Sequence, residues 1–429
     1  MLASGLAVLS ALLAHVGAAE FEAAARIDTR VGEAPTGAQV TAAGQSVPAQ
    51  QKQVAVAATP LLGLRWSDDV NDLRASSATR ILWRPVPLLE MRPLFLETLE
   101  ASYLLRPSRR SRWRLELRGS YGEEDYTSLA QQFTNQPALP TALTMLSLNA
   151  AGDGLWRQSR RTTMILLVGA LHRRALDSST VGTSATTAPA LPTQTLVTAT
   201  PGVRFALSRR SNLEALVGLA ETDIQGIRLA TPFAGTRANI FTVQPQVGLI
   251  EDLNRRHQLR AFVGLTYAAV LINPDKSRPW LPLTPLLRAE LDSFLMRTRA
   301  SVVRSTFGAG AAWFADPVLG AAVLRGTAEA RLDATFGRRW SASARALFTT
   351  DLGRPLAPAV PGGISPDETI AQLEVPIHYR WTDHLALEFG ARFAERAPNL
   401  SATDFRWRNR ELWAFLNVLT TTRPPPRRS

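Results

Sequence analysis

The sequence predicts an all-β protein: a transmembrane antiparallel β-barrel of the bacterial outer membrane with about 18 strands. Three observations predict it. Apolar and polar residues alternate in runs of about a dozen residues along the whole chain. Very short, arginine-rich turns join these runs in pairs, and longer polar loops lead from one pair to the next. The N-terminal segment has the pattern of a secretory signal.

The alternation is clear in the first run, EFEAAARIDTRV. Phe21 and Ile27 fall on one face of an extended strand, and Arg26 and Asp28 fall on the other. The same division recurs over residues 327–336 and again over residues 385–396. Each backbone polar group needs an internal partner in lipid, so strands cross a membrane only as a closed barrel.

Marking every such run gives about 18 strands, within the even numbers usual for these barrels. The expected strands are 20–31, 53–66, 73–84, 93–106, 112–126, 142–157, 161–176, 194–208, 212–226, 239–252, 257–271, 284–296, 299–313, 321–336, 340–352, 369–380, 384–396 and 408–420. The short turns are expected on the periplasmic side. The strand 53–66 then runs inward from outside, so an earlier strand, 20–31, is required.

Tryptophan placement agrees with a membrane barrel, because aromatic side chains gather at both membrane–water interfaces. Five tryptophans sit at or beside short turns: Trp66, Trp113, Trp156, Trp340 and Trp381. The loops rich in Pro, Thr and Ala are expected outside the cell. These are Gln136–Thr144, Ser178–Thr193, Asn273–Pro285 and Arg354–Glu368.

The expected division of the chain is a cleaved signal peptide (1–19), the barrel (20–421) and a Pro/Arg-rich tail (422–429). The signal has an apolar core but no basic residue before it, so either translation starts upstream or the α-amine supplies the charge. Asp316-Pro317 interrupts the longest later apolar stretch, which argues against helical membrane spans. The last strand is followed by a tail and does not end on an aromatic residue. Either the barrel-assembly machinery recognises an internal aromatic residue, Trp413 or Phe415, or the tail is a late addition.

Composition argues against several other classes of protein. The chain has no cysteine, so neither disulfides nor thiolate-held metals are available. The net charge is +12, and lysine occurs only at Lys52 and Lys276. Nucleic-acid binding is not expected, because the arginines recur at turns and alternate strand positions instead of on one patch. We expect no catalytic, cofactor-binding or metal-binding residue; His378 and His384 flank a turn without the carboxylates of a zinc site.

The informative polar residues are those expected to line the lumen: Arg112, Arg114, Glu116, Arg118, Arg288, Glu290, Asp292, Glu329, Arg331, Asp333, Glu374, Arg380, Glu388 and Arg392. Two interpretations stay open for them. They form cross-barrel ion pairs that hold the wall, or their arginines engage anionic groups in transit.

The arginine pairs of the short turns also allow two interpretations. They contact anionic lipid headgroups, or they form a docking ring for a periplasmic partner. The pairs are Arg109-Arg110, Arg160-Arg161, Arg209-Arg210, Arg255-Arg256 and Arg338-Arg339. Outer-membrane lipids, lipopolysaccharide and the barrel-assembly machinery are expected contacts of any such barrel.

The region Ala58–Leu129 resembles porin-like outer-membrane barrels of about 18 strands that partner polysaccharide-export proteins in exopolysaccharide secretion. Arg92-Pro93-Leu94, the run Ser108–Trp113 and the run Ser120–Tyr126 carry the resemblance. It implies a passive conduit for a polysaccharide, working with a periplasmic export protein and an inner-membrane synthesis complex. It transfers no site residue. Two alternatives remain: a general diffusion porin, with Ser178–Thr193 as its constriction, or a plugged barrel with a structural or adhesive role.

Overall fold

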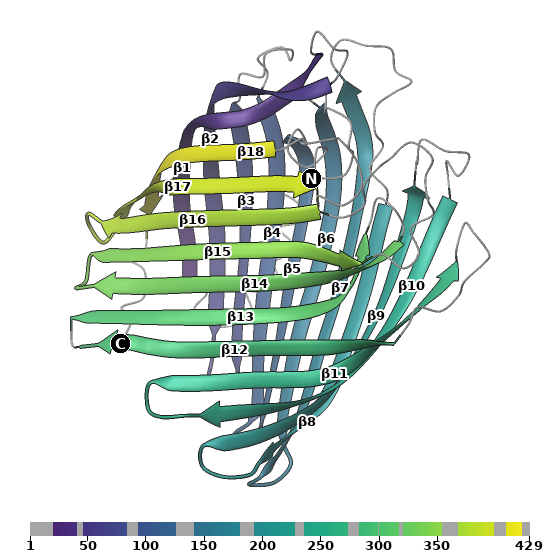
Figure 1. The fold of residues 1–429 in the computed structure, drawn as a ribbon. Helices are drawn as coiled ribbons and strands as arrows, with labels where there is room; N and C mark the ends of the chain where they lie inside the picture. The colour runs from purple at the N-terminus through teal and green to yellow at the C-terminus, as the bar shows by residue number, and fades with distance from the viewer. Residues whose placement is uncertain are drawn as a thin grey trace.

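In a computed structural model, the chain forms one closed, 18-stranded antiparallel sheet (Figure 1). The structure describes residues 20–40, 46–83, 93–125, 141–180, 193–227, 236–272, 283–298, 300–316, 321–353, 368–398 and 409–422. The signal segment 1–19 and tail residues 423–429 lie outside these ranges. The described residues contain no helix that is long and apolar enough to span a membrane.

The strands follow one another round the barrel in chain order, and β1 pairs with β18 to close it. They are β1 Glu20–Val40, β2 Ser46–Ser67, β3 Asn71–Trp83, β4 Leu94–Ser108, β5 Ser111–Asp125, β6 Thr141–Arg157, β7 Thr162–Thr180, β8 Thr193–Ala206, β9 Ser211–Ile227, β10 Thr236–Asp252, β11 His257–Ile272, β12 Thr284–Arg297, β13 Ser301–Asp316, β14 Ala321–Phe336, β15 Trp340–Gly353, β16 Glu368–Arg380, β17 Leu385–Pro398 and β18 Asn409–Thr421. The predicted fold class and strand number are confirmed.

The first hairpin is longer than the sequence predicts. β1 continues past residue 31 to Val40, and β2 starts at Ser46 instead of residue 53. Their register shifts between Pro35 and Gly37, which marks a β-bulge. The side-chain alternation ends before this extension, whereas backbone pairing does not depend on alternation. The pattern therefore could not reveal it.

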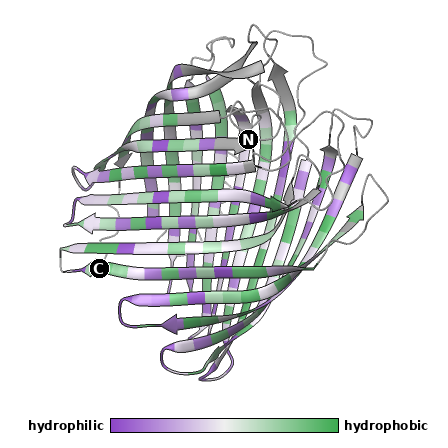
Figure 2. Cartoon of the chain, viewed as in Figure 1, coloured by the Kyte–Doolittle hydropathy of each residue, from purple (hydrophilic) through white to green (hydrophobic). Residues whose placement is uncertain are grey.

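Each strand carries one apolar face, which is the face expected to meet lipid. On β1, Phe21 is 70% exposed and Ile27 is 51% exposed. Leu332 and Phe336 show the same exposure pattern on β14. In Figure 2 hydrophobic and hydrophilic residues alternate along the strands. We call this the apolar face and call the opposite one, which holds Arg26 and Asp28, the charged face.

The tryptophans next to the short turns lie on the apolar face, as predicted. The ring of Trp113 on β5 lies against Gly154 on β6, where an added Cβ would come within 2.3 Å of it. Trp340 packs on Tyr379 with ring centroids 4.5 Å apart, and Trp381 meets the same tyrosine edge-on at 6.3 Å. These rings form part of the aromatic girdle expected of a membrane barrel.

Eight connections of two to four residues join β2 to β3, β4 to β5, and so on to β16 and β17. In Figure 1 these tight turns lie at the left and lower edge of the barrel. The other nine connections have four to 15 residues. Most of the expected constriction, Ser178–Thr193, lies in one of these and outside the described residues. We call the end of the barrel with the tight turns the short-turn rim.

Candidate functional site: the charged face of the barrel

The strand register brings the expected lumen residues onto a single face. Asp28 on β1 pairs with Asn417 on β18, and Asn417 pairs with Glu388 on β17. Following such pairs round the sheet reaches the residues named from the sequence on β5, β12, β14, β16 and β17. The apolar/polar alternation of the sequence predicts which residues of one strand share a face. The register between strands shows that the polar faces of all these strands form one continuous face.

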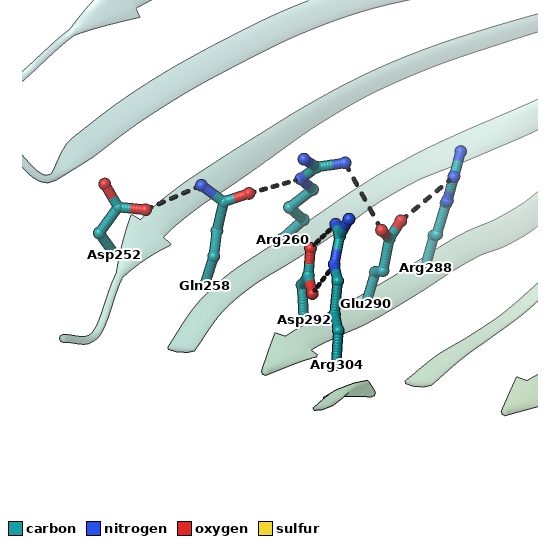
Figure 3. Close-up of polar contacts among 7 residues, drawn as sticks. All are labelled: Asp252, Gln258, Arg260, Arg288, Glu290, Asp292 and Arg304. Atoms are coloured by element: carbon teal, nitrogen blue, oxygen red, sulfur yellow. Dashed lines mark hydrogen bonds and ion pairs between the residues drawn. The ribbon is translucent and has the colours of Figure 1, made fainter. Parts of the chain in front are cut away.

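On β10 to β13 the charged face carries a chain of five polar residues and, beside it, a separate ion pair (Figure 3). Arg304 on β13 donates from Nε to Asp292 on β12 at 2.7 Å and makes a second contact through Nη2. Glu290 accepts ion pairs from Arg260 at 3.5 Å and from Arg288 at 3.6 Å. The chain of polar residues runs on from Arg260 through Gln258 to Asp252. We call these seven residues the paired wall.

Arginines on β5 and β14 also form ion pairs with carboxylates. Arg114 donates to Asp153 on β6 at 2.6 Å, and Arg112 reaches the same carboxylate at 3.1 Å. Arg331 pairs with Asp333 at 2.8 Å along β14. Other ion pairs join neighbouring strands: Arg118–Glu100, Arg204–Glu214, Arg325–Asp351 and Arg345–Glu329. Ion pairing is thus the prevailing state of the charged face.

Where the barrel closes, a polar cluster spans four strands. Arg26 on β1 pairs with Asp28 at 2.5 Å and reaches across β18 to Glu388 on β17 at 3.4 Å. Glu388 also accepts from Asn417 at 2.7 Å and contacts His378 on β16 at 2.9 Å. We call the region formed by β17, β18 and β1 to β3 the seam.

Three seam arginines differ from the rest of the face. Arg30, Arg80 and Arg392 have no hydrogen bond or ion pair to any described residue, although Arg80, Asp28 and Arg392 lie within electrostatic range of Arg30. The register explains the lack of partners for Arg30 and Arg80, whose cross-strand neighbours are apolar, but not for Arg392. Arg30 stands opposite Ala55 and Phe415, Arg80 opposite Leu96, and Arg392 opposite Trp413 and Glu374. Glu374 is the only acidic residue among these cross-strand neighbours, and no ion pair joins it to Arg392.

The histidines of the described chain make ordinary contacts. His384 contacts the backbone carbonyl of Thr421 at 3.0 Å. His257 and Ser293 stand 2.9 Å apart on neighbouring strands, a pairing the sequence did not suggest. Among the described residues no carboxylate contacts the other imidazole nitrogen of His257, and Ser293 is 5% exposed. The pair therefore lacks the third member and the access of a catalytic triad. No group of three or more His, Asp or Glu side chains within the described ranges could hold a metal ion.

The sequence missed the acids that complete the ion pairs. Asp153, Glu214 and Asp351 each lie outside any run of alternating charged residues in the sequence. Each is recognised only from the residue opposite it on the next strand. The seam arginines Arg30 and Arg80 were missed for a related reason, because what distinguishes them is the apolar character of their cross-strand neighbours.

No family model and no curated protein matches the sequence. Among solved structures, the chain is similar to the copper transporter OprC, with 12% identity, a TM-score of 0.46, and coverage of 94% of this chain and 81% of that one. It is also similar to OpdQ of Pseudomonas aeruginosa, with 10% identity, a TM-score of 0.40, and coverage of 94% and 97%. For the siderophore receptor PirA of Pseudomonas aeruginosa the identity is 9%, the TM-score 0.43, and the coverage 94% and 80%.

Identities and TM-scores this low identify no family, and the resemblance to barrels that partner polysaccharide-export proteins finds no support in these matches. The location follows from the barrel itself. A closed antiparallel sheet with an exposed apolar face and an aromatic girdle is the architecture of an integral protein of the bacterial outer membrane.

Proposed function

We propose that the protein is a passive, porin-like channel that lets small polar solutes cross the outer membrane. The observation that carries the proposal is the strand number. Barrels of about 16 to 18 strands leave an aqueous channel, whereas 22-stranded transporters hold a plug. Here 18 strands close the sheet, and no connection between consecutive strands exceeds 15 residues.

In this proposal the charged face lines the channel. The contact of Arg26 with Glu388 supports this, because the two residues lie on strands separated by β18. Side chains two strands apart converge on the concave side of a barrel and diverge on its convex side. The exposed apolar side chains on the other face support the same orientation, since the lipid-facing side must be apolar.

Ion pairing among the lumen residues then determines the ion selectivity of the channel. The paired wall keeps the lumen hydrated while it cancels most of its own field. The seam arginines leave positive charge available, so a weak preference for anions is expected. Arginine contacts carboxylate, sulfate and phosphate groups through its planar fork. Weak contacts of this kind let a solute enter and also leave.

The test is reconstitution of the full chain in planar bilayers and in liposomes. We expect stable single-channel conductance, a modest anion preference in the reversal potential, and swelling of liposomes in small sugars and amino acids. A folded barrel that neither conducts ions nor admits small solutes would contradict the proposal.

A second candidate is a polysaccharide exit that works with a periplasmic export protein. Trp413 and Phe415 favour it, because both aromatic rings lie on the charged face beside Arg392 and Arg30. Flat aromatic rings offer large apolar contacts to sugar rings. Deletion of the gene separates the candidates. Loss of surface polymer with normal synthesis would favour the exit, and reduced uptake of small solutes with normal surface polymer would favour the porin.

A further inference from the structure

Ten arginines gather on the short-turn rim. They come from five turns with two consecutive arginines each: Arg109-Arg110, Arg160-Arg161, Arg209-Arg210, Arg255-Arg256 and Arg338-Arg339. All of these side chains are exposed. None has a side-chain ion pair with any residue of the described chain. We call this group the arginine ring.

A shared backbone device presents four of the five pairs. The residue before each pair is Ser or Asn, and its side-chain oxygen accepts backbone N–H groups from the far side of the turn. Ser208 accepts from Arg210 and Ser211, both at 3.0 Å, and Asn254 accepts from Arg256 at 2.7 Å and from His257 at 3.0 Å. Ser108 and Ser159 cap their turns in the same way. The cap satisfies the turn backbone and leaves both guanidinium groups free.

The charge of the rim is not balanced by acids in the same turns. Asp68, Asp69 and Asp383 belong to the turns that join β2 to β3 and β16 to β17. The five arginine turns join the strand pairs from β4 to β15. The positive charge therefore occupies the sector of the rim from β4 to β15, and the acid-bearing turns flank this sector on both sides.

The apolar face reaches right up to this sector. Leu207 and Leu253, each directly before a cap residue, are 53% and 51% exposed. Trp113, Trp156 and Trp340 stand next to three other arginine turns and are 43%, 52% and 45% exposed. Exposed apolar and aromatic side chains of this kind mark the level of the membrane–water interface. We therefore expect the arginines of the adjacent turns to lie at the depth of the lipid phosphates.

We propose that the arginine ring binds the headgroups of anionic phospholipids in the leaflet at the short-turn rim. Adjacent guanidinium groups can engage one phosphate bidentately, and their charge favours phosphatidylglycerol over a zwitterionic lipid. A soluble acidic partner would need no apolar side chains beside the caps, whereas Leu207 and Leu253 fit a bilayer surface. The ring thus fixes the depth of the barrel at this leaflet.

The test uses the tryptophans of the rim as reporters. The full chain is reconstituted in bilayers with increasing fractions of brominated phosphatidylglycerol or brominated phosphatidylcholine, and quenching gives the relative association constant of the two lipids. We expect a preference for phosphatidylglycerol on the order of fivefold, or about 1 kcal/mol. The preference should fall towards one in 1 M salt, because exposed charges are screened.

Variants locate the effect. Replacement of Arg209, Arg210, Arg255 and Arg256 with Gln should lower the preference, and replacement of the same four with Lys should keep most of it. A charge-matched control replaces Arg114, Arg288, Arg331 and Arg345 on the charged face with Gln and should keep the preference of the wild type. Heat-dependent mobility in gels verifies that each variant is folded.

Two outcomes would overturn the proposal. One is equal association of both lipids with the wild-type barrel, which would leave an acidic protein as the occupant of the ring. The other is an unchanged preference in the folded four-Gln turn variant, because the preference would then arise elsewhere on the barrel.

Discussion

The paired wall and the seam are built from the same residue types but differ in their charge balance. In the wall, Arg304 meets Asp292 across one strand pair, and Arg260 meets Glu290 across the next. At the seam, Arg30 meets Ala55 and Phe415. An arginine on the charged face is therefore structural or available according to whether a carboxylate on its own or a neighbouring strand pairs with it. This difference divides the proposed lumen into a neutral region and a positive one.

The largest effect is expected from removing the seam charge. We expect phosphate to bind the seam arginines and block the chloride current of the unmodified channel. Replacement of Arg30, Arg80 and Arg392 with Gln should abolish this block and lower the anion-to-cation permeability ratio several-fold. Bilayer reversal potentials and phosphate titrations measure both effects. The physical reason is that these guanidinium groups have no ion-paired carboxylate among the described residues to displace before they meet an anion.

A charge-matched variant sharpens this comparison. Replacement of Arg114, Arg304 and Arg331 with Gln removes the same number of charges from paired positions. It should shift the reversal potential but keep the phosphate block. Equal loss of block in both variants would break the distinction between the seam and the paired arginines.

A smaller shift is expected from Arg114→Ala combined with Arg331→Ala. The two substitutions remove one ion-pair partner each from Asp153, which keeps Arg112, and from Asp333, so the lumen loses two positive charges. The reversal potential should move towards cation preference. An unchanged potential would contradict the assignment of the charged face to the lumen.

Neutralising a whole pair should have almost no effect on selectivity. Asp292→Asn combined with Arg304→Gln removes both charges, and the reversal potential should stay at the wild-type value. The unfolding free energy should fall by only about 0.2–1 kcal/mol in the single variant Arg304→Gln, because Arg304 is 48% exposed and water screens the pair. A double-mutant cycle in denaturant gives the coupling.

The smallest effect concerns a turn beside the seam. The Asn71 side chain and the backbone N–H groups of Asn71 and Val70 donate to the Asp68 carboxylate and hold its pKa below the ordinary 3.8. Because the folded pKa is lowered, the cap stabilises the turn above the unfolded pKa and is lost as the pH falls through the folded value. Amide exchange at Val70 and Asn71, corrected for intrinsic rates, should rise in that acid window.

The serine-capped turn at Ser208 provides the control, because its hydroxyl does not titrate. Exchange at the amides of Arg210 and Ser211 should show no such step. A step of equal size in both turns would mean that acid loosens the whole rim instead of the Asp68 cap.

Much of the fold could be predicted because alternation is local. The sequence predicts a strand at 321–336, which are the bounds of β14 in the structure. The prediction succeeds because successive residues alternate between apolar and polar side chains. The extension of β1 to Val40 was not predicted, because backbone pairing across a bulge leaves no such pattern. For the candidate site, the sequence predicts the charged residues of the face but not all of their ion-pair partners. Arg114 could be placed on a polar face, but its partner Asp153 depends on the register between β5 and β6, which one strand does not specify.

The pairing of β1 with β18 has a consequence for the order of the chain. Thr422 donates its backbone N–H to the Ala23 carbonyl at 2.9 Å, so the two ends of the sheet meet on the short-turn rim. Each strand makes its ladders only with its two sequence neighbours or across this junction. A circularly permuted chain, with the junction sealed by a linker and one arginine turn opened, would preserve every ladder. The barrel is a ring of hairpins in which no hairpin needs to come first.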